Sequence, residues 1–133
     1  MNTIEVAAGL VFRSGQLLIT RRHADAHLGG LWEFPGGKRE AGESFEDCLR
    51  RELREELGIE VEVRELVETI THAYPEQTVL LKFFRCAWRA NEPQPLGCPA
   101  FAWVGAEELA AYEFPAADAR LLDLLRTRAE LWR

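Results

Sequence analysis

Long hydrophobic runs are missing from this chain of 133 residues. Apolar residues make up 47% of the sequence, but no stretch approaches the roughly 20 apolar residues that a membrane-spanning helix needs. The first residues, MNTIEVAAGL, also lack the basic segment and apolar core of a secretory signal. We therefore expect no membrane partner and predict a cytoplasmic location.

An excess of basic residues is missing as well. The chain holds 16 Lys and Arg against 22 Asp and Glu, which gives a formal net charge of -6. A broad basic surface for DNA, RNA or an acidic membrane is therefore not expected. A few local cations are still enough for a small anionic ligand, so the expected partner is a small molecule and not a nucleic acid polymer.

Cysteine is scarce, and its pattern excludes a disulfide framework. Cys48, Cys86 and Cys98 are an odd number without paired spacing, and we expect reduced thiols buried as small core residues. The length is enough for one hydrophobic core but short for two, so we predict a single domain over residues 1–133. The sequence leaves monomer and homodimer both open.

Runs of strand-forming residues alternate with turns and with helical periods. We predict strands over 4–12, 16–22, 59–66, 78–88 and 100–104, with a turn at RSG after the first and a glycine-rich loop over 29–42. Helices are predicted over 45–57, 106–112 and 117–131. These elements indicate an α/β fold in which helices cover the faces of a mixed sheet.

The helix predicted over 45–57 carries an unusual group of carboxylates. The run RELREELG places Glu52, Glu55 and Glu56 at spacings of three and four, where like charges repel by roughly a few tenths of a kcal/mol per pair. Glu56 also projects within the arc of the apolar stripe that ends at Leu57. An ion-paired surface helix does not explain this. A divalent cation does, since Mg²⁺ binds through one or two carboxylates together with substrate phosphates.

Both ends of this helix are marked, and a glycine-rich stretch precedes it. Ser44 with Asp47 three residues later forms a capping-box pattern, and Gly58 stands where a helix end favours a left-handed residue. Before them, EFPGGKREAGES places Gly37 where backbone can approach a ligand closely, followed by Lys38 as a charge suited to phosphate. Adjacent glycines alone indicate a turn, and their significance comes from their spacing to the glutamates.

That spacing resembles a complete Nudix box. Gly37, Glu43 and the run from Arg51 to Ile59 fill every fixed position of the pattern. A wider similarity to the MutT-like branch, which sanitises nucleotide pools, extends from AAGLVF through LLITRRHADAH and LWEFPGGK to EFPAAD. The resemblance implies an α/β/α sandwich and hydrolysis of a nucleoside diphosphate linked to another group, with Mg²⁺ or Mn²⁺ as cofactor.

The resemblance also assigns residues. The implied metal ligands and catalytic residues are Glu52, Glu55 and Glu56, with the Gly37 carbonyl as a further metal ligand. Glu43 and Arg51 are implied to orient the loop and the helix. In the MutT branch water attacks the β-phosphorus, so that a triphosphate yields a monophosphate and pyrophosphate. One departure is that the glutamate expected shortly before the late Trp is Gly97 here. Either the glutamates of the predicted helix suffice without it, or Glu92 or Glu76 takes its place, and the sequence leaves these alternatives open.

The nucleoside contacts match only in part. The candidates are Arg22, Phe34, Gln77 and Asp118, of which Gln77 replaces an arginine and Asp118 a base-reading asparagine. A protonated Asp118 would satisfy both the N7–H donor and the O6 acceptor of 8-oxoguanine, as an amide does, whereas a carboxylate would accept from the amine of cytosine. Alternatively, or in addition, Asp118 caps the last helix.

The expected function is that of a MutT-like pyrophosphohydrolase for modified nucleoside triphosphates, with 8-oxo-dGTP as first choice. A CTP or 5-substituted dCTP pyrophosphohydrolase comes next, followed by an ADP-ribose or nucleotide-sugar hydrolase. A non-catalytic nucleotide sensor is the alternative outside the enzymes. The intact set of glutamates disfavours it, because a sensor has no need for a full metal site.

Overall fold

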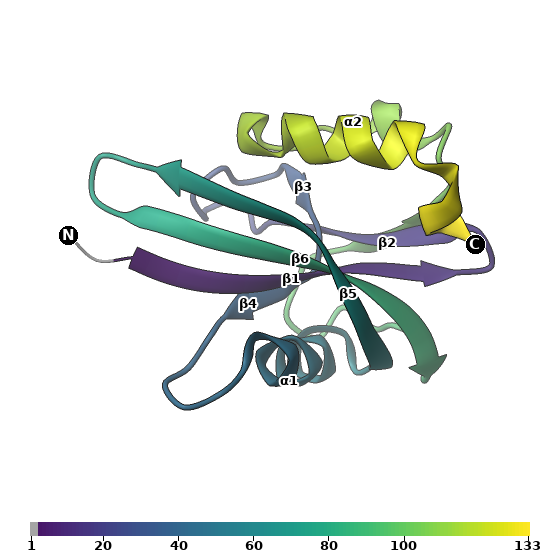
Figure 1. Ribbon diagram of the computed structural model, residues 1–133, viewed down its shortest axis with the longest axis horizontal. Coiled ribbons are helices and arrows are strands. Elements are labelled where there is room, and N and C mark those ends of the chain that lie inside the picture. The colour runs from purple at the N-terminus through teal and green to yellow at the C-terminus, as the bar shows by residue number, and fades with distance from the viewer. Residues whose placement is uncertain (1–2) are drawn as a thin grey trace.

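The computed structural model describes residues 3–133, in which a seven-stranded sheet lies between two helices (Figure 1). The strands are β1 Thr3–Arg13, β2 Gln16–Arg21, β3 Trp32–Glu33, β4 Gly36–Lys38, β5 Glu60–Ala73, β6 Thr78–Ala90 and β7 Phe101–Val104. The helices are α1 Phe45–Leu57 and α2 Ala119–Thr127, with short 3₁₀ turns η1 Leu109–Ala111, η2 Ala116–Asp118 and η3 Ala129–Trp132. No helix within the described range is long and apolar enough to cross a membrane.

Strand β1 organises the sheet. It runs parallel to β6 over almost its whole length, and β6 pairs antiparallel with β5. The other edge of β1 is divided: its end pairs with β2, while the residues from Val6 to Ala8 pair antiparallel with β4. The glycine-rich segment is therefore hydrogen-bonded to the central strand and held in a fixed position beside α1.

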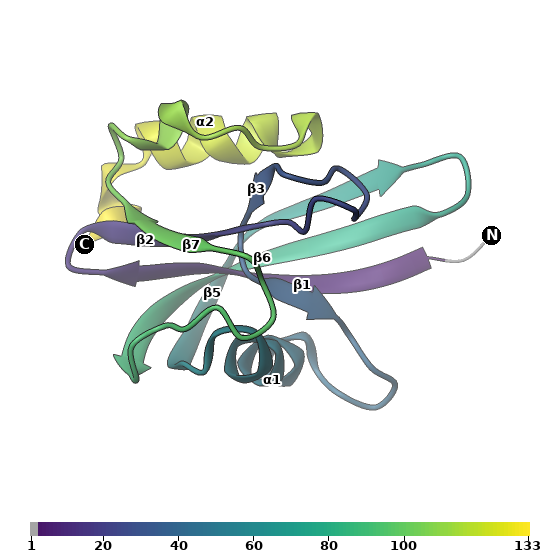
Figure 2. The same cartoon turned by 180° about the vertical axis from the view of Figure 1, so that it is seen from behind.

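Each face of the sheet has its own apolar core. Leu49, Leu53 and Leu57 of α1 pack with Val11 and Leu18 on one face. On the opposite face, Leu121 and Leu125 of α2 pack with Leu10, Leu17 and Ile19. The two views in Figures 1 and 2 show α1 and α2 on opposite sides of the sheet. This is the expected α/β/α sandwich with a mixed sheet.

The local signals at α1 and at the first turn are confirmed. The Ser44 side chain accepts a hydrogen bond from the Asp47 amide at 3.0 Å, and Gly58 has the left-handed φ of 72°. The turn between β1 and β2 is tight, with positive φ at both Ser14 and Gly15. The three cysteines are free and buried.

Four predicted elements were wrong in extent. The loop predicted over 29–42 contains β3 and β4, because β2 and β1 offer unpaired edges there. The strand predicted over 59–66 continues to Ala73, because β6 supplies a partner along the whole length. The helix predicted over 106–112 is only the turn η1, in which Leu109 alone is buried, and the helix predicted over 117–131 is broken at Arg128. A short segment with one buried side chain lacks the packing that stabilises a helix.

Candidate functional site

A cavity of about 460 Å³ opens between the first residues of β1 and β6, the segment after β2, and η2. Its floor is apolar and includes Ile4, Val6, Ala8, Phe34, Val79, Leu81 and Phe83. Its polar lining comprises Arg22, His27, Glu33, Lys38, Tyr74, Gln77 and Asp118. An apolar pocket with a few polar groups is the usual form of a small-molecule site. We call it the large cavity.

All five predicted substrate contacts line this cavity. Arg22, Phe34, Lys38, Gln77 and Asp118 come from separate parts of the chain and converge there. The ring of Phe34 is 5% exposed and stacks on Phe114 with centroids 5.0 Å apart. Its position is therefore fixed by packing before any ligand binds.

Asp118 is buried at the wall of the large cavity. It occupies the position just before α2, but its side chain makes no capping hydrogen bond, so the expected capping interaction is absent. Only 7% of the residue is exposed. Burial, reinforced by the nearby charge of Glu33, raises the pKa of Asp118 to about 6. The neutral carboxyl is therefore accessible at mildly acidic pH.

The raised pKa of Asp118 has a consequence for stability. The ordinary value of 3.8 applies when the chain unfolds, so the stability contributed by the neutral carboxyl is complete below about pH 4 and is lost as pH rises through about 6. At pH 7 the free energy of unfolding of Asp118→Asn should therefore exceed that of wild type by at most about 3 kcal/mol, and its Tm should be higher. The difference should shrink towards pH 4. Thermal unfolding across this pH range measures it. A difference that is constant with pH would contradict the burial of a titrating carboxyl.

Glu33 is a functional candidate that the sequence reasoning missed. It lies on β3 opposite Thr20, lines the large cavity, and accepts a hydrogen bond from Arg22 Nη1 at 2.7 Å. Burial raises the pKa of Glu33, against the effect of Arg22. The available signal was an acidic residue between two aromatic ones in LWEFPGGK, directly before the glycines.

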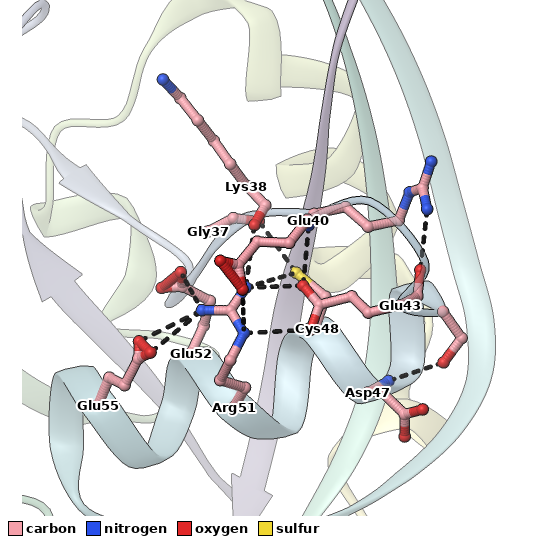
Figure 3. A network of polar contacts seen from close by, with 11 residues as sticks. Gly37, Lys38, Glu40, Glu43, Asp47, Cys48, Arg51, Glu52 and Glu55 are labelled. Carbon is pink, nitrogen blue, oxygen red and sulfur yellow. Dashed lines mark hydrogen bonds and ion pairs between the residues drawn. The ribbon is translucent and has the colours of Figure 1, made fainter.

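Two glutamates of α1, Glu52 and Glu55, lie around Arg51 (Figure 3). Arg51 Nη1 lies 3.2 Å from Glu52 Oε1 and 3.1 Å from Glu55 Oε1, while Nη2 donates to Glu43 Oε1 at 2.7 Å. Hydrogen bonding to Arg51 lowers the pKa of Glu43 to about 2, and the same contact raises the pKa of Arg51. One guanidinium thus joins three of the predicted residues.

Gly37 is packed directly against this network. A Cβ built at Gly37 would lie 2.3 Å from the carboxyl carbon of Glu52, so any side chain there would displace the carboxylate. The Gly37 carbonyl accepts a long hydrogen bond of 3.5 Å from Cys48 Sγ. Lys38, the next residue, contributes its carbonyl to Arg51 at 3.2 Å, while its side chain extends away from the network (Figure 3).

Glu56 lies apart from Arg51 and is more deeply buried than Glu55. Its Oε1 is shielded from solvent and has no hydrogen-bond partner within the described part of the chain, as is also true of the Thr20 hydroxyl. Burial raises the pKa of Glu56 to about 8, and the charges of Glu33 and Glu52 add to the effect; the nearby Thr20 hydroxyl, which is not within hydrogen-bonding geometry of Oε1, and the charge of Arg22 oppose it. An unpaired buried carboxylate is costly unless something compensates its charge.

The carboxylates fit a hard divalent cation in their chemistry. Carboxylate and carbonyl oxygens are the ligands that Mg²⁺ and Mn²⁺ prefer. The unpaired Oε1 of Glu56 and the contact of Gly37 with Glu52 are the features of this structure that agree with such a site. Among residues 3–133, however, no three acidic, His or Cys side chains are grouped to hold a metal in this arrangement. Arg51 lies between Glu52 and Glu55, so a cation has to compete with it.

The segment before β7 is bonded to the end of α1. The amides of Leu96 and Gly97 donate to the Glu56 carbonyl at 3.1 and 3.0 Å, and Figure 2 shows this segment passing α1. The structure places neither expected substitute for the missing glutamate here. Glu92 pairs with Arg13 at 2.6 Å, and Glu76 is exposed in the turn after β5. The residue that reaches Gly97 is His23, whose Nε2 lies 3.2 Å from its carbonyl.

Comparison with known proteins decides the family. The family model described as NUDIX domain matches residues 7–124. The chain belongs to the Nudix family. An 8-oxo-dGTP diphosphatase of Proteus vulgaris is 40% identical over 90 residues, covering 67% of this chain and 80% of the relative. A CTP pyrophosphohydrolase of Escherichia coli (strain K12) is 38% identical over 128 residues, covering 92% and 91%.

The solved structures agree with this assignment. A structure from an analysis of MutT from Aliivibrio salmonicida and Vibrio cholerae is 31% identical and superimposes with a TM-score of 0.79, covering 94% of this chain and 97% of that chain. The Nudix fold and the MutT resemblance are therefore confirmed, and the protein is a hydrolase. The individual site residues stay predictions.

Proposed function

We propose that this Nudix hydrolase is a MutT-like pyrophosphohydrolase that converts modified nucleoside triphosphates into a monophosphate and pyrophosphate, with Mg²⁺ or Mn²⁺. The observation that supports it most is the continuity of the site. The large cavity, of a size suited to a nucleoside, is lined by Gly36, Gly37 and Lys38, and Gly37 packs directly against the Glu52 carboxylate of α1. The base of one nucleotide would thus lie in the large cavity, and its phosphate chain would lie near the α1 carboxylates.

Within this proposal, Glu52, Glu55 and Glu56 hold the cation with the Gly37 carbonyl, and Glu43 and Arg51 orient them. A bound divalent cation neutralises phosphate charge and lowers the pKa of bound water. The chain's own contribution is position. Arg51 holds Glu52 and Glu55 in place through ion pairs of 3.2 and 3.1 Å, and Glu56, in the ionised form that a bound cation would favour, would accept the proton of the attacking water. The water oxygen bonds to the β-phosphorus, and the bond between the β-phosphorus and the α,β-bridging oxygen breaks. The bridging oxygen leaves with the monophosphate.

Two candidates for the base of the substrate follow from Asp118. Its neutral carboxyl reads 8-oxoguanine as an amide would, and this gives 8-oxo-dGTP as first choice. Its pKa of about 6 favours the carboxylate at neutral pH, and that observation supports CTP or a 5-substituted dCTP as the second candidate. The relatives include enzymes named for each of these activities.

The experiment that tests the proposal is a turnover screen with Mg²⁺. The panel contains 8-oxo-dGTP, CTP, 5-methyl-dCTP, unmodified triphosphates, ADP-ribose and a nucleotide sugar. We expect turnover of a triphosphate with monophosphate and pyrophosphate as products, separated by ion-exchange chromatography. Release of a diphosphate and orthophosphate, or preference for ADP-ribose, would reject the proposed reaction or substrate class.

Ligand binding should also stabilise the protein. Repulsion between Glu52 and Glu56 and the unpaired Oε1 of Glu56 are relieved when a cation binds, so Mg²⁺ with a nonhydrolysable triphosphate should raise the Tm. At a ligand concentration about 100 times Kd the gain is about 2.7 kcal/mol. Differential scanning fluorimetry with an α,β-methylene analogue measures the change in Tm. Buffer without divalent cations and nucleotide without Mg²⁺ are the controls. An unchanged Tm at saturation would favour an ordinary ion-paired helix.

A further inference from the structure

A second, smaller cavity lies on the other side of Glu33. It has a volume of about 100 Å³ and is lined by Arg21, Arg22, His23, Glu33, Glu56 and Cys98. Arg22 and Glu33 line the large cavity as well, so the two spaces meet at this ion pair. A chain of phosphates that starts beside the nucleoside and passes the α1 carboxylates would enter this second space next.

The cationic wall of the small cavity is held in place by backbone carbonyls. Arg21 Nε donates to the Gly30 carbonyl at 3.1 Å. His23 Nε2 lies 3.2 Å from the Gly97 carbonyl, and because a carbonyl only accepts, Nε2 carries a hydrogen; the other nitrogen, Nδ1, can donate to a phosphate oxygen in the doubly protonated form of the ring. Side chains fixed in this way lose little freedom when they bind.

The charges around the small cavity are divided between two sides. Arg22 is neutralised by Glu33 at 2.7 Å, whereas Arg21 pairs with no carboxylate among the described residues. Glu56 faces the same space with its unpaired Oε1. Guanidinium groups on the wall favour an anion, whereas the carboxylate of Glu56 on the same wall favours a cation. Phosphate oxygens bound to a divalent cation match both sides.

We propose that the small cavity binds the terminal phosphates of the substrate and then the pyrophosphate product, with Arg21 and His23 as their contacts. The inference rests on the proposed function, because pyrophosphate needs a binding site only if the proposed reaction forms it. Arg21 thereby supplies a cationic contact, and His23 a hydrogen-bond contact, at the place where the loop glutamate is absent. Arg21 is the last residue of β2 and His23 follows two positions later, so both residues are positioned by this strand of the sheet.

The test is direct titration of inorganic pyrophosphate into the protein with Mg²⁺ by isothermal calorimetry. His23→Gln and Arg21→Gln should each weaken pyrophosphate binding by at least about tenfold, as expected for loss of a charge-assisted contact. Binding of the nucleoside monophosphate should change less than about twofold, because it occupies the large cavity. Arg21→Lys should restore part of the loss. Arg126→Gln, an exposed change on α2, is the matched control and should bind as wild type does.

The outcomes separate this proposal from the reaction itself. Unchanged pyrophosphate binding in both His23→Gln and Arg21→Gln would overturn it. So would a weaker affinity for Mn²⁺ alone in His23→Gln, which would make His23 a metal ligand. If no triphosphate is turned over and yet pyrophosphate binding depends on Arg21 and His23, the proposed function fails while the anion site stands.

Discussion

Replacing Glu56 by Gln is expected to lower kcat by at least about 100-fold without loss of the fold. The change removes one charge and keeps the shape of a side chain whose Oε1 is buried and unpaired. Because the pKa of Glu56 is raised to about 8, the folded metal-free protein already favours the neutral form that Gln imitates at pH 7. The Tm of the variant should therefore equal or exceed that of wild type, while steady-state kinetics with Mg²⁺ reveal the loss.

A matched change on the same helix separates charge from position. Glu46→Gln alters an exposed carboxylate in the first turn of α1 and should leave kcat within about twofold of wild type. Near-normal turnover in Glu56→Gln would remove Glu56 from the catalytic group. A fall in turnover that is accompanied by a large fall in Tm would instead indicate damage to the packing of α1.

Asp118→Asn should change which base is preferred. An ionised Asp118 accepts from the exocyclic amine of cytosine, while an amide satisfies both groups that 8-oxoguanine presents. We expect the substitution to shift the ratio of kcat/KM for 8-oxo-dGTP to that for CTP by roughly 1 to 3 kcal/mol, the scale of one bidentate base contact. Parallel kinetics with both nucleotides at pH 8 measure the shift.

The pH dependence provides the internal check for Asp118. In wild type, the ratio of kcat/KM for 8-oxo-dGTP to that for CTP should rise as pH falls through about 6, where the carboxyl gains its proton. In Asp118→Asn this ratio should not change with pH in that range. Asp123→Asn, an exposed change on α2, serves as control. Base preference that is identical in wild type and Asp118→Asn at every pH would show that Asp118 does not read the base.

The sequence allowed most of α1 and its surroundings to be predicted, because the signals there are local. The Ser44 cap, the Gly58 terminus and the spacing of the glutamates depend on residues a few positions apart, and the helix lies where they indicated. The position of Glu56 within the apolar arc followed from helix geometry alone. Family resemblance then supplied what periodicity cannot, which is the convergence of Arg22, Gln77 and Asp118 on one cavity.

What could not be predicted depends on contacts between distant parts of the chain. Glu33 acquires its burial and its partner only when β3 pairs with β2. The approach of His23 to Gly97 joins residues 74 positions apart, and no local pattern announces it. The length of β5 was underestimated for the same reason, because its last residues form a strand only beside β6.

Arg51 supplies, from within the chain, a positive charge to two of the carboxylates that the proposed cation would bind. Its guanidinium contacts Glu52 and Glu55, so part of the repulsion among the α1 carboxylates is already relieved, although Glu56 lies apart from it. If the proposed cation serves turnover and not folding, the chain should fold without added metal. In a cell short of divalent cations the protein would then persist without its proposed activity, and the activity would return with the metal without new synthesis.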